Sequence, residues 1–135
     1  MAANAQRVEW LRSVELFSAL EDEALARVAS LGTEVDALPG AVLTHPSQPG
    51  AGMFVIESGH AIVELRGGKT RKLAAGDCFG ELALLTAEGE RTARVRAETA
   101  LRCFAITRDD FRNLLEREPT IAVALLPVLA SRLVE

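Results

Sequence analysis

Cysteine is scarce in this sequence, and two cysteines among 135 residues exclude a disulfide framework. The spacing of Cys78 and Cys103 does not match a metal site either. Cys103 alternates with Leu101 and Ala105 along an apolar run, and free cysteines are commonly buried. We therefore expect both cysteines to be small core residues.

Clusters of histidine are also lacking, because His45 and His60 are the two histidines of the chain and stand fifteen positions apart. A metal enzyme on a cupin-like barrel would need several clustered histidines and a carboxylate. No pair of nucleophile and base is evident. The sequence therefore predicts a protein that is not an enzyme and has no metal or cofactor.

A basic surface and a long hydrophobic run are absent as well. The net charge is −4, so we expect no direct binding to nucleic acid. The longest nearly uncharged run, Ile121–Ala130, is too short to span a bilayer, and residues 1–7 lack the apolar core of a signal peptide. These features predict a cytoplasmic protein without membrane insertion.

Length and composition fit one folded domain over residues 1–135. Hydrophobic residues make up 49% of the chain and charged residues 25%, which is ordinary for a globular protein. A chain of this length can bury most of its apolar surface without disulfides.

Helical patterns are expected at both ends of the chain, over residues 5–31 and 108–134. Trp10 and Leu11 fall in a short opening helix, and the Ser18–Glu21 pattern predicts a capping box for a second helix that ends before Gly32. Its expected buried residues are Leu25, Val28 and Ala29. Thr107 is a predicted cap for a helix through Glu116, and Pro119 is a predicted start of the last helix.

Between the helices, residues 33–107 change to a period of two, which is typical of strands. The predicted strands are Thr33–Leu38, Ala41–Thr44, Met53–Ser58, His60–Arg66, Lys69–Ala74, Arg94–Ala97 and Ala100–Thr107. Glycines at 40, 59 and 76 are expected in turns, as is Asp77, and Gly67-Gly68 indicates a two-residue hairpin. The pattern predicts an α+β fold that is mainly β, an antiparallel β-roll or jelly-roll barrel with helices at both ends.

The segment from Phe79 to Ala93, FGELALLTAEGERTA, carries the most chemistry. Gly80 allows close backbone approach, and residues 81–85 form a predicted one-turn helix whose first N–H groups attract a phosphate. Arg91 can pair with a phosphodiester, and the Glu81 carboxylate can accept a hydrogen bond from a ribose hydroxyl. An ordinary exposed ion pair between Glu81 and Arg91 is the alternative.

This segment resembles the phosphate-binding cassette of the cyclic nucleotide-binding domains found in catabolite activator proteins, kinase regulatory subunits and cyclic-nucleotide-gated channels. The family's cassette reads F-G-E-[LI]-A-L-[LI], a short loop and R-[ATS]-A, and residues 79–85 and 91–93 match each marked position. The resemblance extends to Leu16–Leu20, Met53–Gly59 and Ala74–Asp77.

The resemblance implies that Glu81 binds the ribose 2′-hydroxyl and that Arg91 neutralises the cyclic phosphate. The implied ligand-binding residues are Phe79, Gly80, Glu81, Leu82, Ala83, Arg91, Thr92 and Ala93. A threonine after the arginine is associated with cyclic GMP in some eukaryotic relatives, whereas it serves the phosphate of cyclic AMP in bacterial ones. We expect cyclic AMP because the cassette looks bacterial, with cyclic GMP as the alternative.

The predicted last helix differs from that of fuller family members, in which it closes over the base. Pro127 predicts a kink or break there, so the sequence identifies no base-capping residue. Leu125, Leu126, Leu129 and Leu133 form a predicted apolar stripe that packs onto the chain's own barrel or against a second copy. We accordingly expect a monomer or a weak homodimer.

Two functions compete for this sequence. The first is a regulatory sensor that binds a cyclic nucleotide and relays a helix rearrangement to an effector protein or domain. The second is a degenerate relative that keeps the fold as a protein-interaction domain without a ligand. The presence of both Glu81 and Arg91 favours the sensor.

Overall fold

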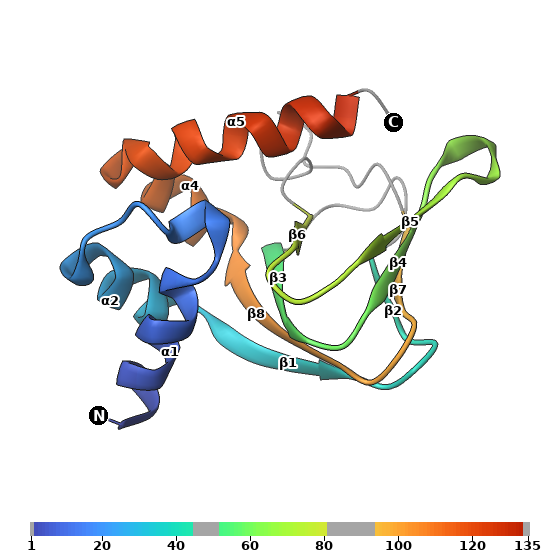
Figure 1. Cartoon of the computed structure of the whole chain (residues 1–135), viewed down its shortest axis with the longest axis horizontal. Coiled ribbons are helices and arrows are strands. Elements are labelled where there is room, and N and C mark those ends of the chain that lie inside the picture. Colours follow the sequence, from blue (N-terminus) through green and yellow to red (C-terminus); the bar gives the residue numbers. More distant parts are fainter. Residues whose placement is uncertain (1, 45–51, 81–93, 134–135) are drawn as a thin grey trace. The chain divides into compact units, whose positions relative to one another are not determined.

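A computed structural model of the chain describes residues 2–44, 52–80 and 94–133 (Figure 1). The chain divides into two compact units, a helical unit of Met1–Gly32 with Arg112–Glu135 and a sheet unit of Thr33–Phe111. The boundary on the C-terminal side falls inside a helix, between Phe111 and Arg112. The prediction of one domain over residues 1–135 stays a prediction.

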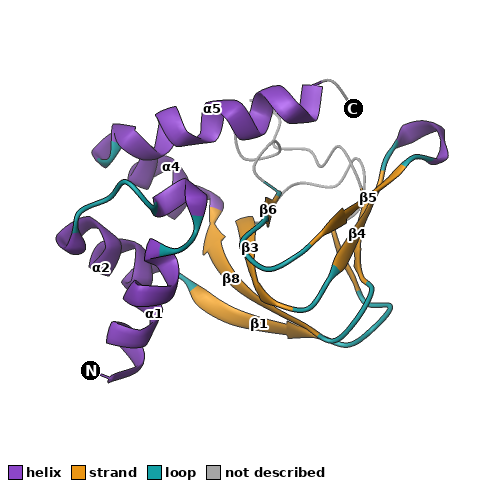
Figure 2. Ribbon diagram, viewed as in Figure 1, coloured by secondary structure: helices purple, strands orange, loops and turns teal. Residues whose placement is uncertain are grey.

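The sheet unit contains two four-stranded sheets in which every pairing is antiparallel (Figure 2). The first sheet has the order β1 (Thr33–Ala37), β8 (Leu101–Thr107), β3 (Gly52–Ser58) and β6 (Cys78–Phe79). The second has the order β2 (Val42–Thr44), β7 (Arg94–Ala97), β4 (Ala61–Glu64) and β5 (Thr70–Leu73). The prediction of a mainly β, antiparallel roll is confirmed, although the described strands form two sheets and not one closed barrel.

One hydrophobic cluster draws side chains from both sheets. Its buried members are Ile56, Ala61, Val63, Leu73, Phe79, Val95, Ala97, Leu101 and Cys103. Ala37, Leu43, Phe54 and Leu65 pack against this cluster while remaining partly exposed. Because β-strand side chains alternate between faces, these residues identify the inward face of each strand. Burial of Cys103, and also of Cys78, confirms the core prediction for both cysteines.

The predicted turn glycines lie at the corners of the sheets. Gly40, Gly59 and Gly76 all have positive φ, at 87°, 93° and 93°. At Gly59 an added Cβ would lie 2.2 Å from the Ala100 carbonyl oxygen, so a side chain does not fit. The turn between β3 and β4 therefore requires glycine for conformation and for space.

The hairpin between β4 and β5 differs slightly from its prediction. Leu65 N–H donates to the Lys69 carbonyl at 2.8 Å, which leaves three residues, Arg66–Gly68, in a short 3₁₀ turn. Gly67 and Gly68 both have positive φ, as the glycine pair indicated. The turn is therefore one residue longer than the two-residue loop expected from the sequence.

The helical unit contains α1 (Ala2–Arg12), a 3₁₀ turn η1 (Glu15–Phe17), α2 (Asp22–Leu31) and α5 (Pro119–Leu133), with most of α4 (Arg108–Arg117). α1 contacts α2, and α5 contacts η1. Leu25, Val28 and Ala29 of α2 are at most 1% exposed, which confirms the predicted stripe. Among the described residues, no helix is both long and apolar enough to cross a membrane.

An ion pair connects the N-terminal and C-terminal segments of this unit. Arg27 Nη1 of α2 lies 2.6 Å from Glu118 Oε1, and Glu118 is the residue between α4 and α5. Both side chains are partly buried, at 35% and 22% exposed. The pair therefore links the junction between α4 and α5 to α2.

The predicted capping box at Ser18–Glu21 is wrong. Ser18 Oγ donates to the Glu15 carbonyl at 3.0 Å, so it closes η1, and the residue preceding α2 is Glu21, whose side chain makes no cap bond. The Ser-x-x-Glu pattern is shared by caps and by turns that precede a helix. By contrast, Thr107 does cap α4, because its Oγ1 accepts the Asp110 N–H at 3.2 Å.

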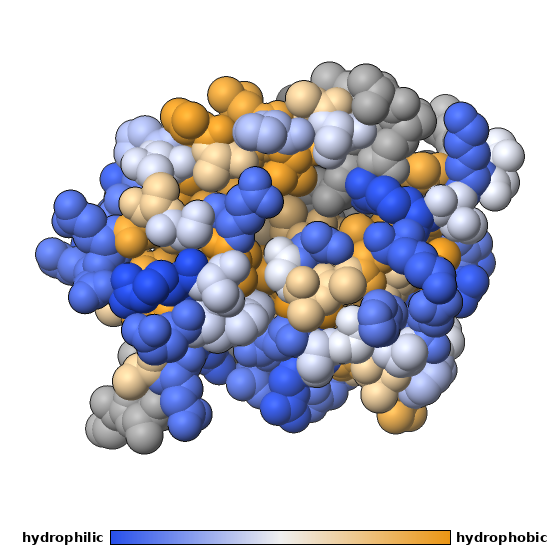
Figure 3. All heavy atoms as spheres, in the orientation of Figure 1, coloured by the Kyte–Doolittle hydropathy of each residue, from blue (hydrophilic) through white to orange (hydrophobic). Residues whose placement is uncertain are grey.

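The last helix begins at Pro119 as predicted and continues through Pro127 without a break. Of the kink or break expected at Pro127, the break does not occur. The predicted leucine stripe is only partly correct, since Leu125 is 2% exposed but Leu126 is 62% exposed. Val123 is also exposed, and Figure 3 shows apolar surface over α5.

Candidate functional site

Most of the predicted ligand-binding residues lie outside the described part of the chain. Those six are Glu81, Leu82, Ala83, Arg91, Thr92 and Ala93. Phe79 and Gly80 are described at the start of the segment, and Arg94 is described immediately after it. The site is therefore described through β6 and β7, the strands that flank this segment.

The two ends of the segment belong to different sheets. β6 ends at Phe79 and pairs with β3 in the first sheet, whereas β7 starts at Arg94 and pairs with β4 and β2 in the second. Residues 80–93 consequently connect the two sheets along the chain. Phe79 and Val95, one near each end, both belong to the same hydrophobic cluster.

The first end is rigidly supported. The Phe79 ring is 1% exposed and stacks on Phe54 of β3 at a centroid distance of 4.9 Å with 12° between the planes. Gly80 follows with φ of 89°, a left-handed conformation that favours glycine. The stacked Phe79 ring and the positive φ of Gly80 together define the conformation at the end of β6.

A tight turn before β6 adds to this support. Asp77 Oδ2 accepts the Ala74 N–H at 2.9 Å, and the Asp77 N–H donates to the Ala74 carbonyl at 3.0 Å. The Asp77 carbonyl in turn accepts the Ile56 N–H of β3 at 2.9 Å. Asp77 is thus a turn residue, as the sequence predicted.

The second end carries two arginines on the outward face of β7. Arg94 pairs in register with Glu64 of β4, and both Arg94 Nε and Arg96 Nε lie near Glu64 Oε1, at 3.7 and 3.0 Å. The Arg94 side chain is exposed, at 45%, and the Arg96 side chain is partly buried, at 39% exposed. Because they are two positions apart on one strand, Arg94 and Arg96 share the same strand face.

One charged residue of the inward face escaped the sequence analysis. Arg71 of β5 pairs in register with Val63, which is 3% exposed and belongs to the hydrophobic cluster. Arg71 itself is partly buried, and its Nε atom is buried. The strand sequence is Thr-Arg-Lys-Leu. Because its first three residues are all polar, the sequence shows no alternation that would identify the inward-facing residue.

The Cys103 thiol lies in the same cluster and is fully buried. Burial, helped by the Glu57 and Asp36 carboxylates, raises the pKa of the Cys103 thiol from 9.0 to about 12. The thiol is therefore neutral at physiological pH, which removes it as a nucleophile.

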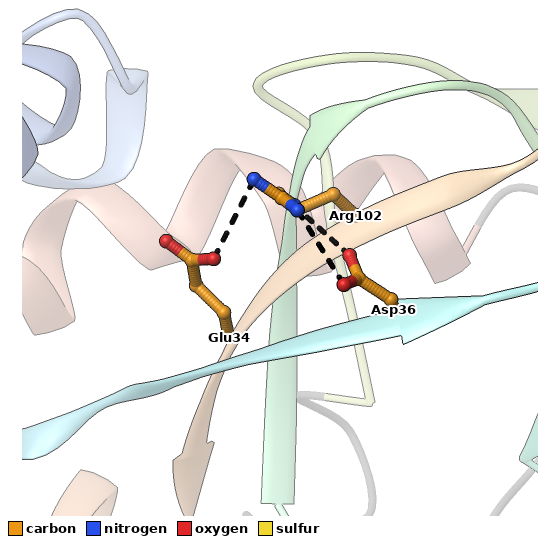
Figure 4. Close-up of polar contacts among 3 residues, drawn as sticks. All are labelled: Glu34, Asp36 and Arg102. Atoms are coloured by element: carbon orange, nitrogen blue, oxygen red, sulfur yellow. Dashed lines mark hydrogen bonds and ion pairs between the residues drawn. The ribbon is translucent and has the colours of Figure 1, made fainter.

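A polar cluster on β1 and β8 belongs to the surface of the first sheet. Figure 4 shows Arg102 between Glu34 and Asp36, with Nε–Oδ1 of Asp36 at 2.9 Å and Nη1–Oε2 of Glu34 at 3.6 Å. The hydrogen bond that Arg102 donates to the Asp36 carboxylate is the main reason that the pKa of Arg102 is raised. Since Asp36 pairs with Arg102 in register, the cluster stabilises strand pairing and needs no ligand.

No group of three or more His, Cys, Asp and Glu residues in the described ranges could hold a metal ion. His60 is exposed, and its backbone N–H donates to Thr99 Oγ1 at 3.0 Å. His45 lies outside the described residues.

Comparison with known proteins adds an independent finding. A family model described as "Cyclic nucleotide-binding domain" matches residues 34–118. The potassium/sodium hyperpolarization-activated cyclic nucleotide-gated channel 4 of Homo sapiens is 39% identical over 95 residues, which cover 70% of this chain and 8% of the channel. The chain thus spans less than a tenth of that relative.

Two solved structures agree with this match. The catabolite activator protein of Thermus thermophilus has a TM-score of 0.76 and 30% identity, covering 88% of this chain and 58% of that one. The regulatory domain of Toxoplasma gondii PKA, crystallised with cAMP, has a TM-score of 0.83 and 25% identity, covering 96% and 50%. The similarity to these two structures therefore extends over most of this chain.

Proposed function

Because the chain belongs to the cyclic nucleotide-binding domain family, we propose that it is a regulatory sensor module that captures a cyclic nucleotide through residues 79–93. The observation that carries this proposal is the complete cassette pattern, with Glu81 and Arg91 both present, between strands of two different sheets. The ligand is cyclic AMP or cyclic GMP.

Each proposed ligand contact follows from the chemistry of one residue. The Arg91 guanidinium pairs with the cyclic phosphate, and its charge compensates that of the phosphodiester. The Glu81 carboxylate accepts a hydrogen bond from the ribose 2′-hydroxyl. Backbone N–H groups of Gly80, Leu82 and Ala83, with Thr92, complete the anion site, while Phe79 and Ala93 bound it.

The relay to the rest of the chain runs through covalent connections that the structure describes. β8 leads directly into α4 at Thr107–Arg108, and the boundary between the sheet unit and the helical unit falls inside α4. A ligand shifts a conformational equilibrium only when it binds the two states with different affinity. We therefore assign the output to a rearrangement of α4 and α5 that an effector protein or domain detects.

Calorimetry with cyclic AMP and cyclic GMP on the intact chain and on Arg91→Ala tests the proposal. The variant should lose roughly 1.5–3 kcal/mol of binding free energy, at least about tenfold in affinity, because a charge-assisted pair is removed. Glu81→Gln should bind more weakly than the intact chain but better than Arg91→Ala.

An exposed arginine provides the matched control. Arg94→Ala removes a charge three positions later, on the outward strand face, and should leave affinity unchanged. Absence of binding by the intact chain at high micromolar nucleotide would contradict the sensor and support the ligand-free interaction domain instead.

A further inference from the structure

The strand β5 lies at one edge of the second sheet and carries a concentration of positive charge. Within the described strands β5 has a neighbour, β4, on one side only. The run from Leu65 to Gly76 contains Arg66, Lys69, Arg71 and Lys72 and neither Asp nor Glu. Lys69 and Lys72 are the two lysines of the chain. This edge of the sheet is therefore basic, although the chain as a whole has a net charge of −4.

The register of β4 and β5 shows which backbone groups point toward the open edge. Leu65 N–H donates to the Lys69 carbonyl at 2.8 Å, so these two residues form a hydrogen-bonded pair. Hydrogen-bonded and non-hydrogen-bonded pairs alternate along antiparallel strands, which places Thr70 and Lys72 in non-hydrogen-bonded positions. Their N–H and C=O groups are therefore directed away from β4, to the side on which no described strand lies.

The side chains at this edge are exposed. Lys72 is 73% exposed and lies 3.6 Å from Glu98, a surface ion pair that a further carboxylate can share. Lys69 and Thr70 are exposed as well. Glu64, which is in register with Thr70, already pairs with the two arginines of β7. In Figure 1 the tip of the β4–β5 hairpin projects beyond the other described strands of its sheet.

An open strand edge combined with positive charge favours one kind of partner. An extended polypeptide segment pairs with an edge strand through its main chain, whereas a nucleic acid or a lipid headgroup has charge but no matching row of N–H and C=O groups. Like charges on neighbouring strands are unfavourable, which disfavours a second copy of β5 and favours an acidic segment. Because charges more than about 8 Å apart are largely screened at physiological ionic strength, the local charge of the edge outweighs the net charge of the chain.

We propose that β5 is a docking edge for an acidic, extended segment of a partner protein, which adds to the second sheet as a further strand. The main chain of the segment pairs with Thr70 and Lys72, and its alternating carboxylates lie beside Lys72 on the outward face. The docking edge contains no residue of the 79–93 segment and requires no bound nucleotide, so the proposal goes beyond the sensor function and does not depend on it.

Synthetic heptapeptides that alternate Glu with Thr and Val test this proposal on the full chain. The acidic peptide should bind with a Kd below about 1 mM, and a peptide with Lys in place of each Glu should bind at least about tenfold more weakly. In NMR spectra of the chain, the acidic peptide should shift the amide signals of Thr70 and Lys72 and slow their hydrogen exchange, because both amides gain acceptors.

An acidic peptide that is N-methylated along its whole main chain separates strand pairing from charge. It keeps the carboxylates but lacks the N–H donors, so it should bind several-fold more weakly than the unmodified peptide. Equal binding by the methylated peptide, or by a single-stranded oligonucleotide of the same charge, would overturn the proposal. Absence of binding by the acidic peptide would overturn it too. Amide shifts at Thr70 and Lys72 that follow the concentration of the chain alone would assign the edge to a second copy instead.

Two variants of β5 complete the test. Thr70→Pro removes one donor of the docking edge at the first residue of the strand, where proline is tolerated. The preceding residue, Lys69, already has φ of −73° and ψ of 146°, which suits a position before proline. Thr70→Pro and Lys72→Gln should each weaken binding of the acidic peptide by about three- to fivefold, as expected for the loss of one cross-strand interaction.

Arg12→Gln is the matched control, because it removes the same charge from α1, where Arg12 pairs with Asp22 at 2.7 Å. It should bind the acidic peptide as the intact chain does. Unchanged affinity in either β5 variant would assign the peptide to another surface and overturn the proposal. If Thr70→Pro does not fold, the methylated peptide tests the main-chain pairing on the intact chain.

Discussion

Cys103 illustrates how a residue can be chemically silent in the folded chain and reactive in the unfolded chain. Its thiol is buried in the cluster between the sheets, and its pKa is raised to about 12. Below the pKa of the unfolded thiol, near 9.0, the thiol is neutral in both states and the free energy of unfolding does not depend on its ionisation. Between that pKa and the raised pKa of the folded thiol, only the unfolded chain ionises, so the free energy of unfolding falls as the pH rises.

Unfolding measured between about pH 8 and pH 10.5 should show this loss. The intact chain should lose about 2 kcal/mol more of unfolding free energy than Cys103→Ala over that range. The reason is that pH 10.5 lies about 1.5 pH units above the pKa of the unfolded thiol, and each unit corresponds to about 1.4 kcal/mol. Comparison of the two chains cancels the titration of lysines and of Cys78. Parallel pH curves would show that the folded thiol ionises normally.

At the scale of elements, α5 contains an unusual position. Pro127 lies inside the helix and is exposed, so the Val123 carbonyl four residues earlier lacks its intrahelical N–H donor. The helix forms nonetheless, because Ile121 and Leu125 are buried and packing outweighs a local helix preference.

Pro127→Ala should restore the missing hydrogen bond and raise the unfolding free energy by about 1–3 kcal/mol. Denaturant unfolding measures the difference, and Ser131→Ala, another exposed position of α5, should change stability by less than about 0.5 kcal/mol. A loss of stability in Pro127→Ala would mean that the proline is required by the packing of this helix.

The elements also show what the sequence could predict. Among the described residues, alternation located seven of the eight strands within one or two residues, because a half-buried strand repeats every two positions. β6 is only two residues long and has no period to detect. The inward direction of Arg71 depends on its register with Val63, which is long-range information that no local pattern contains.

At the scale of the whole molecule, the proposed relay predicts a response away from the ligand. Saturating cyclic nucleotide should alter amide hydrogen exchange in peptides of α4 and α5 as well as in residues 33–107, because the helices adopt a different arrangement in the bound state. Arg91→Ala with the same nucleotide is the control and should show no change. Changes restricted to residues 33–107 would indicate binding without a relay.

The strand order has a consequence for how the chain acquires its structure during synthesis. Within the described strands, β1 pairs with β8 and β2 pairs with β7. β1 and β2 therefore each pair with a strand that is synthesised at least fifty residues later. β7 and β8 each lie between two earlier strands of their sheet. The described strands of the second sheet are therefore all present only when β7 has emerged from the ribosome, and those of the first sheet only when β8 has followed. Native structure should accordingly appear late in synthesis, as β7 and then β8 leave the exit tunnel.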